Sequence, residues 1–265
     1  MGEERALSVL AIILICLLGI IVLFLLILLI SALAVDTKKS FLKDSPYYRY
    51  LALLLCRIIL FILHVRIHES GKEIVPPSGR FLLVSNHLAN IDPMVQMLTL
   101  KDRPLAYISK EENFHIPLIG RIIRRCCFLS IDRENIGKSM RVFMTASSLL
   151  KNDTVSIGIY PEGTRNKTDA PLLPFHNAVF LVAKGGKVPV VICSLKGTAI
   201  PHFSPFRAHD VNIQFLAVLS ADYIQSHSQA EISDKVRQIL SLQLDPEAAR
   251  SVSGPAEIRK SEDAP

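Results

Sequence analysis

The stretch from Phe81 to Pro93 has the sequence FLLVSNHLANIDP and combines three local signals. It opens with a short apolar run, residues 81–84, which is typical of a buried strand. It closes with Asp92-Pro93, because aspartate favours the N-cap of a helix and proline favours the first helical position. Residues 87–91 between them then form a loop. The stretch therefore predicts a strand, a loop and a helix in succession, which is the repeating unit of α/β domains.

The same alternation continues toward the C-terminus. Strands that alternate with helices favour an α/β sandwich with a largely parallel or mixed sheet. The polar residues 245–265 lack periodicity, so we expect a disordered tail there. Further strands are predicted over residues 105–109, 127–131, 154–160, 188–195 and 211–218, and helices over 93–101, 117–125, 135–151, 177–184 (closed by the glycines at 185 and 186) and 229–242.

The N-terminal part is strongly apolar, and no charged residue occurs between Leu7 and Val35. As a helix this run would be about 44 Å long. It could therefore cross the hydrocarbon core of a bilayer, roughly 30 Å thick, with some tilt. A cleaved secretory signal is the alternative, because Ala32-x-Ala34 resembles a cleavage site. The run is longer than a usual signal and the residues before it are not positive, so we favour a retained anchor.

Basic residues lie mainly after this apolar run. Lys38, Lys39 and Lys43 follow it, whereas only Arg5 precedes it. Because Lys- and Arg-rich flanks stay in the cytoplasm, we expect the main domain to face the cytoplasm from the cell membrane. The predicted division of the chain is a transmembrane anchor over residues 1–36, a second membrane-associated helix over 37–66, a globular domain over 67–244 and the tail.

The second apolar stretch, residues 47–65, is interrupted by Arg49, Arg57 and His64. Tyrosines at its start are typical of a membrane–water interface. In one interpretation the stretch is an amphipathic or re-entrant helix that lies against the membrane. In the other it is a core helix of the globular domain. The sequence leaves both interpretations open.

The overall charge narrows the classes of partner. The net charge is +6 and the sequence pI is about 9.1. A basic balance suits nucleic acid, an anionic membrane surface or phosphorylated substrates, and the apolar N-terminus favours the membrane over nucleic acid. The five cysteines show neither metal-type spacing nor a disulfide framework, which fits a reducing cytosolic setting.

His87 and Asp92 are the first candidates for chemistry. On one continuous helix, residues five apart lie about 140° from each other, so the pair would not meet. A loop over residues 87–91 could instead fold His87 back over Asp92. A carboxylate on one imidazole nitrogen leaves the other nitrogen as a base that can take a proton from an alcohol. From the spacing alone, however, an ordinary loop histidine beside a helix cap is the favoured interpretation.

A second cluster, the sequence PEGTR over residues 161–165, follows a predicted strand, where α/β folds place ligand loops. Gly163 lets the backbone approach a ligand, and the planar guanidinium of Arg165 can hold a phosphate with two hydrogen bonds. Glu162 could orient this arginine or bond to the substrate. The alternative is a strand-end turn with a solvent-exposed ion pair.

Taken together, Asn-His-x4-Asp over residues 86–92 and the later Pro-Glu-Gly-Thr-Arg closely resemble the motifs of the 1-acylglycerol-3-phosphate acyltransferase (lysophosphatidic acid acyltransferase) family. Residues 128–133 look like the middle motif of that family, and residues 188–192 are similar to its fourth. The resemblance covers about residues 67–219. It implies a glycerolipid-acyltransferase-like α/β sandwich with a mixed sheet, and it makes 67–244 an acyltransferase domain.

The resemblance also implies an activity and a set of residues. The expected reaction moves a fatty acyl group from acyl-CoA or acyl carrier protein to the 2-hydroxyl of lysophosphatidic acid, giving phosphatidic acid in phospholipid biosynthesis. We expect direct transfer at a membrane, with neither a cofactor nor a metal, because the clusters lack ligand spacing. The implied catalytic pair is His87 and Asp92, and the implied substrate-binding residues are Lys110, Arg133, Glu162, Gly163, Thr164 and Arg165.

Three departures from the family pattern concern segments that shape the substrate pockets. Cys126-Cys127 stands where the middle motif usually has glycines, residues 175–178 replace a common Phe-Lys-x-Gly, and Cys193 replaces a proline. Another lysolipid acceptor therefore stays open as an alternative. So do a non-catalytic lipid-binding membrane protein and a phosphohydrolase.

Overall fold

The computed structural model describes residues 2–132, 135–199 and 207–245. A seven-stranded sheet forms its centre, in the order β1-β7-β6-β2-β5-β3-β4. Neighbouring strands are parallel except for the antiparallel pair β6–β7, so the prediction of a mixed sheet is confirmed. The strands are β1 (Val65–Ser70), β2 (Leu82–Ser85), β3 (Leu105–Lys110), β4 (Leu129–Ile131), β5 (Ser156–Ile159), β6 (Val190–Lys196) and β7 (His209–Leu219).

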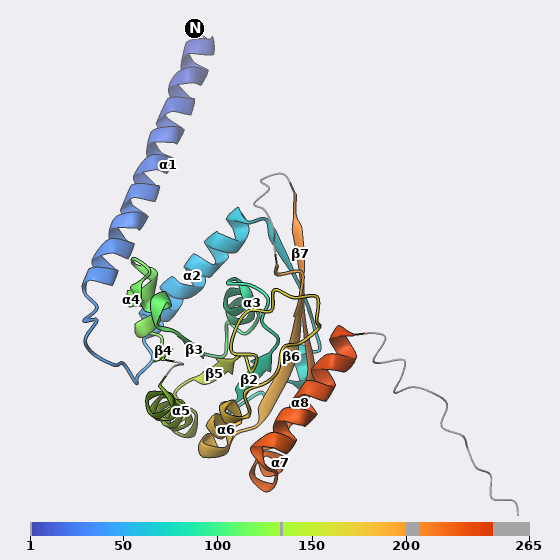
Figure 1. The fold of residues 1–265 in the computed structure, drawn as a ribbon. Coiled ribbons are helices and arrows are strands. Elements are labelled where there is room, and N and C mark those ends of the chain that lie inside the picture. Colours follow the sequence, from blue (N-terminus) through green and yellow to red (C-terminus); the bar gives the residue numbers. More distant parts are fainter. Residues whose placement is uncertain (1, 133–134, 200–206, 246–265) are drawn as a thin grey trace, which may run out of the picture.

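Helices cover both faces of the sheet (Figure 1). Helices α2, α3 and α4 pack into one hydrophobic core, and α5, α6 and α8 pack into the other. The α-helices are α1 (Gly2–Leu33), α2 (Pro46–Ile62), α3 (Asp92–Thr99), α4 (Ile119–Arg124), α5 (Ile136–Lys151), α6 (Leu181–Gly186), α7 (Ala221–Ser226) and α8 (Gln229–Leu244), and the 3₁₀ helices are η1 (Lys72–Ile74), η2 (Glu111–His115) and η3 (Asn177–Phe180).

Strand β2 explains why residues 81–84 form an unbroken apolar run. It lies between β6 and β5 in the middle of the sheet, and every residue in it is buried. Leu82 and Val84 face the core that contains α5 and α8, whereas Leu83 faces the core that contains α2 and α3. A strand covered on both faces has no solvent side for polar residues. The alternation of apolar and polar residues is therefore missing.

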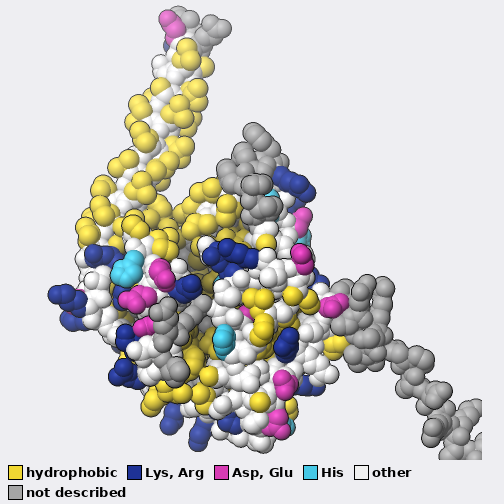
Figure 2. Space-filling model, viewed as in Figure 1, with side chains coloured by type: hydrophobic (Ala, Val, Ile, Leu, Met, Phe, Trp, Pro, Cys, Tyr) yellow, Lys and Arg dark blue, Asp and Glu magenta, His cyan; other side chains and the backbone are white. Residues whose placement is uncertain are grey.

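Helix α1 extends away from the body of the molecule (Figure 1). Figure 2 shows hydrophobic side chains along its exposed length. Among the described residues it is the one helix long and apolar enough to cross a membrane. Its C-terminal end is anchored: Tyr47 and Ser31 share a hydroxyl–hydroxyl hydrogen bond of 2.6 Å, and the Tyr48 hydroxyl donates to the Ser31 carbonyl at 2.9 Å. The rest of the helix is available to a bilayer.

Helix α2 has one face in the core and one face exposed. Leu51 and Leu60 are buried against the domain, whereas Tyr50 and Phe61 are exposed to solvent. Arg49, predicted as an interruption of this stretch, is itself buried: it pairs with Asp44 at 2.7 Å and donates to the carbonyls of Leu105 and Cys126. The helix therefore belongs to the core, and its outer face also carries aromatic residues.

Among the strands and α-helices of the described residues, β1 and α7 were not predicted. Strand β1 is an edge strand that pairs only with β7, and most of its residues are exposed. Its charged residues therefore tolerate solvent, and no apolar pattern marks it. The short α7 begins at the cap Ser220, whose side chain accepts from the Tyr223 amide. A single cap without a periodic stretch is too weak a signal for a helix.

The predicted end of the helix over residues 177–184 was wrong. The segment starts as η3, continues as α6, and ends at Lys187, which has a left-handed φ of 55°. The two glycines lie inside the helix because α6 packs closely on α5. A Cβ on Gly185 would lie 2.6 Å from the Ser147 hydroxyl, and one on Gly186 would lie 2.8 Å from the Leu150 side chain.

The backbone conformation at Cys127 explains why the family pattern usually has glycine at this departure. Its φ of 61° lies in the left-handed region, where glycine is favoured, and its side chain is fully buried in the core. The strand predicted from residue 127 accordingly begins at Leu129. The predicted disordered tail lies outside the described residues from 246 onward.

Candidate active site

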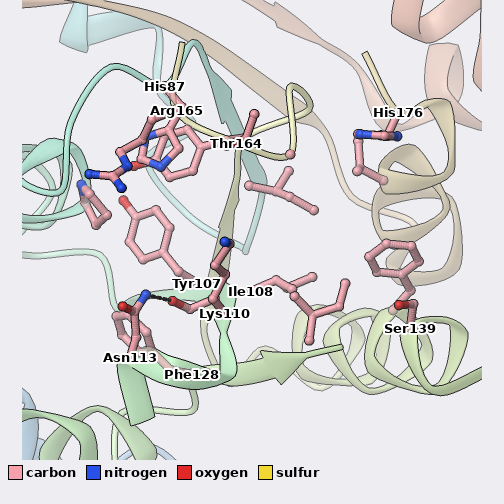
Figure 3. A pocket seen from close by; sticks show the side chains of 18 of the residues that line it. His87, Tyr107, Ile108, Lys110, Asn113, Phe128, Ser139, Thr164, Arg165 and His176 are labelled. Atoms are coloured by element: carbon pink, nitrogen blue, oxygen red, sulfur yellow. Dashed lines mark hydrogen bonds between the residues drawn. The ribbon is translucent and has the colours of Figure 1, made fainter. Parts of the chain in front are cut away.

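The candidate site lies at the carboxyl ends of parallel strands. Strands β2 and β5 are neighbours, so the loop after β2 and the loop after β5 meet at the same edge of the sheet. They border a cavity of about 450 Å³. Figure 3 shows His87 and Arg165 together at one side of this cavity and His176 at the other, with Lys110 pointing into the space between them. Apolar residues, including Phe128, line the remaining wall.

The structure brings His87 and Asp92 into direct contact. The Asp92 Oδ2 lies 2.7 Å from Nδ1 of His87 and also accepts from the amides of Leu88 and Ala89, at 2.7 and 2.9 Å. Asp92 is fully buried, whereas His87 lines the cavity. The carboxylate thus holds the loop and the imidazole together, and it leaves Nε2 as the ring nitrogen able to face a ligand.

The predicted N-cap was wrong by one position. Helix α3 begins at Asp92 itself, with Ile91 in the cap position. A capping aspartate would accept from amides inside the helix, but the Asp92 carboxylate turns back to the amides of the preceding loop. This is the local reason why His87, five residues earlier, can reach it.

The His87 loop is also tied to distant segments. The Asn86 side chain bonds twice to the Leu195 backbone, donating at 2.9 Å and accepting at 2.8 Å. The backbone amide of Asn166 donates to the backbone carbonyl of His87 at 2.7 Å. These bonds cross from β2 to β6 and to the loop after β5, so the loop conformation depends on strand order.

Glu162 lies behind the pocket wall. Its Oε1 accepts from the His87 amide at 2.8 Å, and its Oε2 accepts from the Leu173 amide at 2.9 Å. Burial raises the pKa of this carboxyl, while the two amide donors lower it. The sequence suggested that Glu162 orients Arg165 or contacts substrate. The structure instead shows both its oxygens bound to backbone, where they join the two loops.

The remaining predicted binding residues fall into two groups. Lys110, at the end of β3, and Thr164 and Arg165, in the loop after β5, are exposed and line the cavity. Arg133, the expected ligand of the acceptor phosphate, lies outside the described residues, and its role stays a prediction. The structure therefore brings two of the three predicted basic groups to one cavity.

A ring stack covers one face of His87. The Tyr160 ring lies 4.0 Å from the imidazole, centroid to centroid, and the planes differ by 10°. The Tyr160 hydroxyl donates to Oε1 of Gln96 at 3.0 Å, and the Tyr107 hydroxyl donates to the same oxygen at 2.7 Å. Burial raises the pKa of both phenols well above the usual value, so both stay protonated donors. Sequence analysis missed Gln96, because a lone glutamine on a helix carries no signal.

Gly163 and His176 pack against each other at the opposite side of the cavity. Gly163 has a left-handed φ of 68°, and a Cβ at this position would lie 2.8 and 2.9 Å from two atoms of the His176 ring. The His176 amide also donates to the Pro161 carbonyl at 2.9 Å. Glycine is therefore required here for its backbone conformation and for the space that His176 occupies.

We expect Gly163→Ala to destabilise the protein more than Gly79→Ala. Gly79 has a similar φ of 70°, but nothing lies within 4 Å of a Cβ built there. Gly79→Ala, the control, should therefore lower the free energy of unfolding only by the strain of a left-handed alanine, about 1–2 kcal/mol. Gly163→Ala should cost about 1–3 kcal/mol more, because the side chain overpacks against His176. Urea unfolding of both variants measures the difference, and equal losses would show that the His176 contact is unimportant.

Within the described part of the chain, no group of three or more His, Cys, Asp or Glu side chains is arranged to hold a metal ion. The expectation that the reaction needs neither metal nor cofactor stays a prediction.

Residues 66–196 match the family model described as Acyltransferase. The matched segment contains His87, Asp92 and the whole loop after β5. The predicted resemblance thus acquires independent support from the region that builds the cavity.

Curated proteins similar to this chain include several 1-acyl-sn-glycerol-3-phosphate acyltransferases. The alpha enzyme of Mus musculus is 29% identical over 131 residues, 49% of this chain and 45% of that protein. The Bacillus subtilis enzyme is 29% identical over 127 residues, 48% and 61%. The Haemophilus influenzae enzyme is 30% identical over 131 residues, 49% and 52%. The chain spans about half the length of the curated relatives it matches.

A solved structure supports the same fold. The 1-acyl-sn-glycerophosphate (LPA) acyltransferase PlsC of Thermotoga maritima aligns with a TM-score of 0.61 at 21% identity, covering 75% of this chain and 79% of that one. The sequence comparisons support the resemblance to the 1-acylglycerol-3-phosphate acyltransferase family, and the structural likeness confirms the predicted α/β fold.

Proposed function

We propose that this chain transfers a fatty acyl group from a thioester, acyl-CoA or acyl carrier protein, to the 2-hydroxyl of lysophosphatidic acid. The observation that carries the proposal is the 2.7 Å contact of His87 Nδ1 with the buried Asp92, at the wall of a cavity that also contains Lys110 and Arg165. The names of the relatives supply the acceptor class.

The chemistry follows from the arrangement of the pair. His87 Nε2 takes the proton of the acceptor hydroxyl while the hydroxyl oxygen attacks the thioester carbonyl, and Asp92 stabilises the imidazolium that forms. The new C–O bond forms, the C–S bond then breaks, and the thiolate leaves with the proton from His87. Transfer is direct, because the side chain that faces the acceptor is a base and not a nucleophile.

The basic residues give the site its acceptor preference. Lys110 and Arg165 reach the cavity from different strands, and a phosphate between them would accept charge-assisted hydrogen bonds. Glu162 acts as a positioning residue that joins the Arg165 loop to the His87 amide. The apolar wall, with Phe128 and Met140, suits a lipid chain. The cavity thus combines charge for a headgroup with an apolar surface.

The N-terminal helix supports a location of this site at a membrane. Helix α1 is exposed over almost its whole length, an 18-residue window of it has a mean hydropathy of 3.7, and its C-terminal end docks on α2 and α4. We infer an anchor in the cell membrane with the domain on the cytoplasmic side, because Lys38, Lys39 and Lys43 follow the helix. A lipid acceptor can then reach the cavity from the bilayer.

The test is thiol release from acyl-CoA by the full chain in vesicles. Lysophosphatidic acid should support release, and monoacylglycerol of the same chain length should support it about 10- to 100-fold less well in kcat/KM, because it lacks the charge-assisted contacts. Acyl carrier protein as donor is run in parallel. If thiol release is faster with monoacylglycerol than with lysophosphatidic acid, the proposed acceptor is wrong, and another lipid becomes the better hypothesis. Phosphate release that a chelator stops would indicate a phosphohydrolase.

A further inference from the structure

His87 is held from two directions. Asp92 contacts one edge of the imidazole at Nδ1, and Tyr160 covers one of its faces at 4.0 Å. A hydrogen bond at a single ring nitrogen restrains that edge of the ring, but it leaves the ring plane some rotation about the Cα–Cβ and Cβ–Cγ bonds. A parallel ring against the face removes that rotation. The two contacts therefore determine different degrees of freedom.

Tyr160 is itself anchored in a buried polar network. Its hydroxyl donates to Gln96, whose amide nitrogen donates to the Ser85 hydroxyl at 2.7 Å. Gln96 is nearly fully buried, and it lies on α3, one helical turn after Asp92. One helix therefore supports both contacts of the imidazole, the edge directly and the face through Gln96 and Tyr160.

We propose that Tyr160 is a positioning residue, whose ring fixes the plane of the His87 imidazole and thus the direction of its Nε2 lone pair. The role rests on the proposed acyl transfer, in which Nε2 must point at the acceptor hydroxyl. The stack has a second effect in the same step. The aromatic face attracts the imidazolium that forms when His87 takes the proton. Other charged groups near the ring are Asp92, which meets its edge at Nδ1, Glu162, which accepts from the His87 backbone amide, and Arg165, which lines the same cavity.

The test compares Tyr160→Leu, which removes the ring, with Tyr160→Phe, which keeps the ring and loses only the bond to Gln96. The leucine variant should lose about 10- to 100-fold in kcat, the scale of a misplaced catalytic group. Its KM should change less than about threefold, since the ring acts on the chemical step. The phenylalanine variant should keep kcat within about fivefold of the parent. Tyr160→Met replaces the leucine variant if the latter does not fold.

Tyr223 offers a matched control. It stacks on His227 with centroids 3.8 Å apart and planes that differ by 19°, far from the cavity residues. Tyr223→Leu removes a Tyr–His stack of nearly the same geometry and should leave kcat unchanged. Equal kcat losses in Tyr223→Leu and Tyr160→Leu would overturn the proposal, because they would reflect general destabilisation. Equal losses in the Phe and Leu variants would also overturn it, since the hydroxyl alone would then matter.

An NMR measurement tests the stacking of Tyr160 on His87 independently of turnover. Histidine ring carbons are labelled, and the His87 signals are identified by their loss in His87→Ala. The ring current of Tyr160 should shift the His87 proton signals, and this shift should disappear in Tyr160→Leu and persist in Tyr160→Phe. Unchanged His87 signals in Tyr160→Leu would overturn the stack. If the parent turns over no lysolipid, the acyltransferase proposal fails, while this spectrum still tests the positioning of His87.

Discussion

Replacing His87 with alanine is expected to lower kcat/KM for acyl transfer by about 10²–10⁴-fold, which is the usual contribution of general-base catalysis. Nε2 of His87 is the proposed acceptor of the hydroxyl proton, and the alanine side chain offers no base. Asp92, fully buried, cannot take over this role from its position behind the imidazole. Acceptor-dependent thiol release from acyl-CoA, measured for parent and variant in the same vesicles, gives the ratio.

His68 provides a control for this prediction. Its Nε2 lies 2.7 Å from Asp210, the same distance as in the His87–Asp92 pair, but the two side chains are more than half exposed at the edge of the sheet. His68→Ala should therefore leave kcat/KM unchanged. If His87→Ala retains the parent rate with lysophosphatidic acid, the proposed base is wrong, and a non-catalytic role for the pair becomes the better hypothesis.

Asp92→Asn is expected to lower kcat by about 10²–10⁴-fold with little change in the fold. The asparagine has nearly the same shape but no charge to stabilise the imidazolium. Oδ2 of Asp92 now accepts from His87, Leu88 and Ala89. If the amide oxygen takes this place, the charge is lost. If the amide nitrogen takes it, a donor faces three donors.

The measurement for Asp92→Asn combines kcat with urea unfolding. Asp210→Asn, in the exposed pair, serves as the control and should change neither quantity by much. A variant with parent stability and a large loss of kcat supports the electrostatic role. Parent kcat in a stably folded Asp92→Asn would mean that the carboxylate only shapes the loop, which was the plainer interpretation of the sequence.

Local signals explain which parts of the fold could be predicted. Most strands and helices lie within a few residues of the predicted bounds, because apolar periodicity, prolines and caps act over one or two turns. The errors have local causes as well. Strand β1 lies at an exposed edge of the sheet. Helix α6 runs to Gly186 and is capped by Lys187, although the two glycines had suggested an earlier end. Gly185 and Gly186 serve helix packing, and packing partners are not visible in a local pattern.

The candidate site could be predicted in its residues but not in their arrangement. The motifs identified His87, Asp92 and the loop at residues 161–165. They did not reveal that Glu162 binds the His87 amide from 75 residues away, nor that Gln96 anchors Tyr160 from 64 residues away. Such contacts depend on which strands become neighbours in the sheet.

The sequence by itself determined the apolar N-terminal helix, the succession of strands and helices, and a loop short enough to let His87 reach Asp92. These features are local, since each depends on residues that are close in the chain. The tertiary structure decided the order of the sheet, which places β5 beside β2 and so brings Tyr160 onto the face of His87. It also decided that Glu162 faces backbone amides and not a ligand. Both outcomes follow from packing between distant segments, for which local periodicity carries no information.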